Sequence, residues 1–126
     1  MIAAKIRAEV RSRANNACEY CHLHQDDSPL ASLHVEHIIP KTHGGSDDLA
    51  NLALACIDCN LHKGPNLAGI DPETNSLTAL FHPRQQQWND HFAWNEIYLI
   101  GRTATGRTTI RVLNMNSEDQ LSLRSS

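Results

Sequence analysis

The sequence predicts a small α+β protein whose core is completed by a metal site. Three observations support this fold class: residues 2–14 have helical periodicity, residues 33–39 alternate like a strand, and four cysteines form two C-x-x-C pairs. Aromatic residues make up only 5% of the 126 residues, so the hydrophobic core should be modest. Such a core should need an additional stabilising element, such as a bound metal ion. The length fits one domain, or one domain with an appendage.

The first expected element is a helix over residues 2–14. Apolar residues recur there at every fourth position, and a lysine and a glutamate four residues apart form a helical pair. The apolar residues are Ile2, Ile6 and Val10. Asn15 and Asn16 are typical residues for ending such a helix.

A strand is expected over Leu33–Ile39, where apolar residues alternate with polar ones up to Pro40. The two glycines and the polar residues of 43–48 predict a loop. Leu49–Ala55 has helix-forming residues, but its shortness equally allows a strand, and propensity leaves both assignments open.

Residues 67–126 differ in character from residues 1–66, and we expect them to form a small α/β extension packed on the first segment. A turn is predicted over 71–75 and a strand over 97–100. The stretch 105–116 allows a strand or a helix; Thr105 can serve as an N-cap, and we expect a helix.

The cysteines are the strongest chemical signal. Cys18 and Cys21 form one pair and Cys56 and Cys59 the other, with 34 residues between the pairs. Zinc prefers four such ligands in a tetrahedron, so this spacing predicts a structural zinc site with a pair of zinc knuckles. An iron–sulfur centre, which would absorb visible light, and disulfide or redox use are the alternatives.

The charge distribution also points to cations. The net charge is -3, and residues 25–60 contain six acidic side chains but one basic one. Six of the eight histidines lie within residues 22–62. An acidic, histidine-rich centre suits a cation site. The longest apolar run, Leu52–Ile57, is too short to span a membrane, and the absence of a secretory signal predicts a cytoplasmic protein.

The order of these motifs resembles that of HNH endonucleases that contain a four-cysteine zinc site. The matching residues lie within 18–64 and are Cys18, Cys21, Val35, Glu36, His37, Ile38, Ile39, Pro40, Gly44, Gly45, Asn51, Leu52, Cys56, Cys59, Asn60 and Lys63. The resemblance implies a ββα-metal core: a hairpin of Leu33–Ile39 and Leu52–Cys56, followed by a helix that begins near Cys56.

The resemblance also implies a site that hydrolyses DNA. His37 would be the general base, Glu36 and Asn60 would hold a catalytic Mg²⁺ or Mn²⁺, and Asn51 would brace the loop behind His37. Asn60 stands where the family usually has its last histidine, which makes this an H-N-N variant. On an ideal strand Glu36 and His37 point to opposite faces, so the strand must twist, bulge or end at this point.

Four more residues are candidates for binding the substrate through its phosphates, although each is also compatible with an ordinary surface position. They are His34, His43, His62 and Lys63. A non-catalytic zinc module that binds nucleic acid or protein is the alternative function. It differs from the nuclease in predicting no metal-dependent cleavage.

Overall fold

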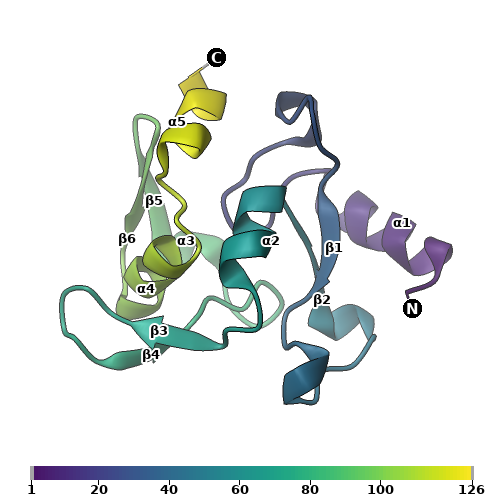
Figure 1. The fold of residues 1–126 in the computed structure, drawn as a ribbon, viewed down its shortest axis with the longest axis horizontal. Helices are drawn as coiled ribbons and strands as arrows, with labels where there is room; N and C mark the ends of the chain where they lie inside the picture. The colour runs from purple at the N-terminus through teal and green to yellow at the C-terminus, as the bar shows by residue number, and fades with distance from the viewer. Residues whose placement is uncertain (1, 126) are drawn as a thin grey trace.

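The computed structural model describes residues 2–125, and its helices and strands are shown in Figure 1. The helices are α1 (Ala4–Arg13), α2 (Ile57–Lys63), α3 (Trp88–His91), α4 (Ala104–Val112) and α5 (Glu118–Ser125). The strands are β1 (His34–His37), β2 (Leu52–Ala55), β3 (Ala68–Ile70), β4 (Leu77–Ala79), β5 (Phe92–Asn95) and β6 (Tyr98–Gly101). They pair as three antiparallel hairpins, β1–β2, β3–β4 and β5–β6. This mixture confirms the predicted α+β class.

The central unit is the β1–β2 hairpin followed by α2, which lies beside β1 and faces the C-terminal elements on its other side (Figure 1). His34 pairs with Ala55 and His37 with Leu52. The segment for which helix and strand were both open is therefore a strand, and all four of its residues are buried. Burial on both faces explains its continuous apolar sequence, which lacks the alternation of a surface strand.

The N-terminal helix α1 is bound to this hairpin through arginines. Arg11 donates a hydrogen bond to the backbone carbonyl of Leu33 at 2.8 Å. Arg13 donates to the carbonyls of Leu49 and Leu52. Val10 of the same helix is fully buried. The basic side chains of α1 therefore include two that stabilise the fold internally.

Residues 67–125 add two hairpins and three helices. The predicted turn at 71–75 connects β3 to β4, a hairpin whose three-residue strands are too short for a periodicity signal. The expected helix near residue 105 is α4, but its N-cap is Thr103, whose hydroxyl accepts from the Gly106 N–H at 3.0 Å; the predicted cap, Thr105, lies inside the helix. The C-terminal helix α5 was not predicted.

One cluster of buried side chains joins the two segments. It extends from Val10 and Leu54 to Phe92, Leu113 and Met115. Trp88 bonds across the junction, donating from Nε1 to the Tyr20 carbonyl at 2.8 Å. Within residues 2–125, no helix has the length and apolar character needed to cross a membrane.

Candidate functional site

The four cysteines converge on one point between the two segments. The Sγ atoms of Cys18, Cys21, Cys56 and Cys59 all lie within 4.8 Å of one another, and all four residues are buried. Tetrahedral zinc with bonds of about 2.3 Å would separate its sulfur ligands by about 3.8 Å. The Cys21–Cys56 sulfur distance is 3.6 Å, so the cluster is suited to structural zinc.

Backbone and side-chain donors surround these sulfurs. The N–H groups of Cys21 and Cys59 each point to the sulfur three residues earlier, both at 3.4 Å, which is the geometry of two knuckles. From α5, the buried Gln120 donates from Nε2 to the Cys56 sulfur at 3.4 Å. Hydrogen bonds from neighbouring thiols, first that of Cys18, lower the pKa of Cys56, whereas burial raises the pKa of Cys18. Donors around a sulfur favour its thiolate form, which is the form that binds zinc.

A separate, shallow pocket of about 310 Å³ lies beside α2. Glu36 and His37 line it from β1 and Asn60 lines it from α2. The strand ends at His37, which allows neighbouring residues to border one pocket despite the alternation of an ideal strand. The three residues proposed for the metal and the base therefore share one pocket.

Glu36 is buried and held from two sides. The Tyr20 hydroxyl donates to its Oε1 at 2.5 Å, and the Lys63 ammonium lies 3.5 Å from its Oε2. Lys63 also donates to the Ile38 carbonyl at 2.8 Å. Burial raises the pKa of Glu36, and the charge of Lys63 opposes that effect. Tyr20 lies between the cysteines of the first knuckle, so the zinc cluster and Glu36 are linked through one side chain.

His37 is paired with the loop that follows β1. Its Nε2 lies 2.7 Å from Oδ1 of Asp47, and Oδ2 of the same carboxylate accepts from Lys41 at 3.0 Å. These two hydrogen bonds, first that with His37, hold the pKa of Asp47 below its usual range. The Asp47 carboxylate is therefore ionised near neutral pH and acts as an acceptor.

Asn51 makes the side-chain to backbone bonds expected of a bracing residue. Its Oδ1 accepts from the Ile39 N–H at 2.8 Å, and its Nδ2 donates to the carbonyls of Ile39 and Ser46 at 2.9 and 2.8 Å. Gly45 lies directly against the Ile39 carbonyl, where a Cβ atom would collide with it. The loop is thus fixed next to the end of β1.

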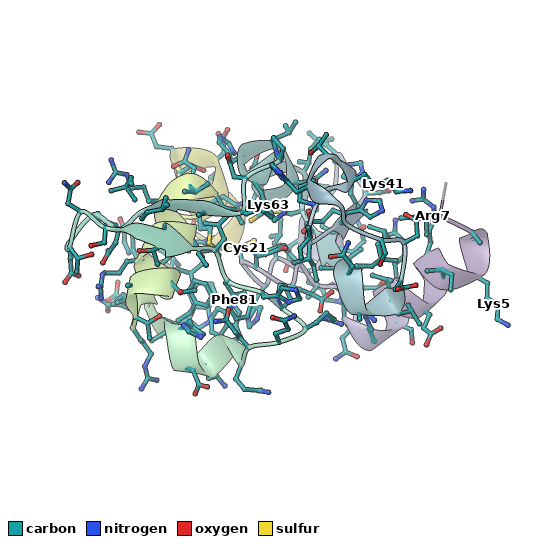
Figure 2. All side chains as sticks on the ribbon, turned by 90° about the horizontal axis from the view of Figure 1, so that it is seen from below. Lys5, Arg7, Cys21, Lys41, Lys63 and Phe81 are labelled. Carbon is teal, nitrogen blue, oxygen red and sulfur yellow. The ribbon has the colours of Figure 1, made fainter. Side chains whose placement is uncertain are left out.

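The predicted phosphate-binding residues have different environments. His34 lines the pocket and is exposed. His43 and His62 are also exposed, and the Nδ1 of His62 contacts the Asp58 carbonyl at 2.8 Å. Lys63 is only 2% exposed and projects onto the middle of the molecule, whereas Lys5 extends at one end (Figure 2). Because its ammonium is bound inside the protein, Lys63 is placed to support Glu36 and the end of β1, in place of the expected phosphate contact.

Three residues of this region were not predicted to have these roles. Tyr20 lies between the two cysteines of the first knuckle. Asp47 lies in a loop with a second aspartate, and Gln120 is 64 residues beyond its sulfur partner. The knuckle position was a signal for Tyr20, but no sequence pattern separates Asp47 from Asp48 or indicates Gln120.

Residues 18–66 match the model of the HNH endonuclease family. The ββα unit and the four-cysteine cluster of these residues agree with that match. The chain is also 27% identical over 118 residues to the Septu protein PtuB of Bacillus thuringiensis. That match covers 92% of this chain and 43% of the relative, so the chain spans less than half of the relative's length.

Proposed function

We propose that this chain is a metal-dependent endonuclease that hydrolyses DNA phosphodiester bonds and leaves a 5′ phosphate and a 3′ hydroxyl. The observation that carries the proposal is the single pocket shared by Glu36, His37 and Asn60 inside an HNH domain. The reducing cytoplasm, where four cysteines remain free to bind zinc, is the proposed location.

The donor set fits a hard divalent ion. Glu36 offers a carboxylate oxygen and Asn60 an amide oxygen, and oxygen ligands favour Mg²⁺ or Mn²⁺ over zinc. Bound there, the ion would supply Lewis-acid stabilisation of negative charge on the phosphate and on the departing oxygen. The charge of Lys63 favours the ionised form of the buried Glu36 without occupying all of its lone pairs, because each carboxylate oxygen has more than one.

His37 takes the proton from the attacking water. The ring is partly exposed, with 24% of its side chain accessible, so water can reach it. A neutral imidazole accepts a proton efficiently near neutral pH, which is the requirement for a general base. The exposed His34 at the rim of the same pocket is proposed to contact a substrate phosphate, as are His43 and His62 outside it.

A plasmid-nicking assay with Mg²⁺ tests the proposal. We expect His37→Ala to lower the cleavage rate by about 100-fold or more, since general bases contribute that much, while zinc content stays unchanged. His24→Ala removes a histidine outside the pocket, with 40% of its side chain exposed and no proposed role, and is the matched control; it should retain most of the activity. Cleavage that persists in His37→Ala would contradict the assigned base.

One observation favours the alternative, a non-catalytic zinc module that binds nucleic acid or protein. The Glu36 carboxylate is 8% exposed and already paired with Lys63, so its affinity for a further cation is reduced. The same assay separates the two functions. A zinc-loaded wild-type protein that binds DNA but cuts it with neither Mg²⁺ nor Mn²⁺ would support the module.

A further inference from the structure

The loop residue Asp47 has a position that the proposed chemistry does not yet use. Its Oδ1 lies 2.7 Å from Nε2 of His37, the proposed general base. Its neighbour Asp48 is equally acidic, yet the side chain of Asp48 has no hydrogen bond or ion pair with any of residues 2–125. The pairing with His37 is therefore specific to one of two adjacent carboxylates.

The loop is built so that Asp47 has little freedom. The carbonyl of Ser46, the preceding residue, accepts a hydrogen bond from the buried Asn51. Gly44 has a φ of +88°, a left-handed conformation that favours glycine, and Gly45 lies against the Ile39 carbonyl. Lys41 holds the second carboxylate oxygen at 3.0 Å, which fixes the plane of the group.

We propose that Asp47 is a positioning residue that holds His37 in the tautomer with hydrogen on Nε2, leaving the lone pair of Nδ1 for the attacking water. An ionised carboxylate can only accept, so Nε2 must donate to it. In a neutral imidazole the other nitrogen is then unprotonated. Within residues 2–125, no protein donor or acceptor is hydrogen-bonded to Nδ1 of His37. This role rests on the proposed function, but the tautomer is a property of the folded chain and can be measured without catalysis.

The test is ¹⁵N NMR of the His37 ring in the zinc-loaded protein, at an alkaline pH at which its ring signals no longer change with pH. The ring signals are assigned by their loss in His37→Gln. Wild type and Asp48→Asn, which removes the same charge one residue away, should show hydrogen on Nε2. Asp47→Ala should show a mixture of tautomers, because solvent replaces the carboxylate, and Asp47→Glu should partly restore the wild-type spectrum.

Cleavage kinetics provide the second readout. We expect Asp47→Ala to lower kcat about 10- to 100-fold with little change in KM, as is usual when a group that orients a reactive histidine is removed. An unchanged ring spectrum in Asp47→Ala, or an equal change in Asp48→Asn, would overturn the proposal. If wild type cuts no DNA, the nuclease proposal fails, and the spectra still decide whether Asp47 sets the tautomer.

Discussion

At the scale of single residues, Asn51 and Asn60 have different roles, one in stability and one in ligand binding. Asn51 is buried and satisfies three backbone groups of the loop, whereas the side chain of Asn60 is half-buried, lines the pocket and has no hydrogen bond within residues 2–125. An amide with its bonds filled stabilises structure, and one with free lone pairs in a pocket is available to a ligand. The two residues therefore separate the stability of the site from its chemistry.

Alanine substitutions test this separation. Asn51→Ala leaves the Ile39 N–H without its acceptor and should lower the free energy of unfolding by about 1–3 kcal/mol. Asn60→Ala should change it by no more than about 0.5 kcal/mol, because no internal bond is lost. Denaturant unfolding of zinc-loaded protein without Mg²⁺ measures both. A larger loss of unfolding free energy in Asn60→Ala than in Asn51→Ala would contradict the roles assigned to the two residues.

At the scale of elements, the zinc cluster connects the ββα unit to the C-terminal helices α3 and α5. Cys56 is the N-cap of α2, and Gln120 of α5 donates to its sulfur. The first knuckle carries Tyr20, which bonds to Glu36 of β1 and accepts from Trp88 at the start of α3. Zinc binding should therefore order the contacts around Glu36 as well as the thiolates themselves.

Tryptophan fluorescence can report on this connection. The chain has two tryptophans, and Trp94→Phe leaves Trp88 as the remaining one. Removing zinc with a chelator should shift the emission of Trp88 to longer wavelength, because the knuckle carbonyl that accepts its N–H is released to solvent. Adding zinc back should reverse the shift. Trp94 is already 44% exposed, so in Trp88→Phe the change should be smaller; equal changes would contradict the local link.

At the scale of the whole molecule, the local patterns predict the central unit well. The two C-x-x-C pairs, the alternating segment before Pro40 and the Asn60 helix are all local in sequence and are found where expected. Partners that meet only in three dimensions could not be predicted. Gln120 reaches Cys56 from α5, and Lys63 turns inward to Glu36, because packing of distant segments decides where those side chains go.

Local sequence patterns also failed to predict part of the secondary structure of the extension. The β3–β4 strands have three residues each, too few for a period of two to be recognised, and only their turn was predicted. The helix near residue 105 begins two residues earlier than expected from Thr105, because Thr103 provides the cap. Boundaries of this kind depend on cap geometry, which propensity does not describe.

One ion pair attaches the β3–β4 turn to α4 and makes the stability of the whole fold depend on pH. Arg107 donates from two nitrogens to both oxygens of the buried Asp71, at 3.0 and 2.8 Å, and these bonds hold the pKa of Asp71 far below its usual range. Because the folded-state pKa is lower than the unfolded value of about 4, the stabilisation is complete above about pH 4 and is lost as the pH falls further.

We therefore expect Asp71→Asn to lower the melting temperature by several degrees. The difference from wild type should stay constant between about pH 8 and pH 5, because neither the folded nor the unfolded pKa lies in that range, and should narrow only below about pH 4. Glu73→Gln is the matched control. Glu73 lies 3.2 Å from the same arginine but is 68% exposed, so water and salt screen it and its loss should have little effect. A difference for Asp71→Asn that already changes between about pH 8 and pH 5 would mean that another titrating group, and not this carboxylate, controls the attachment of the turn to α4.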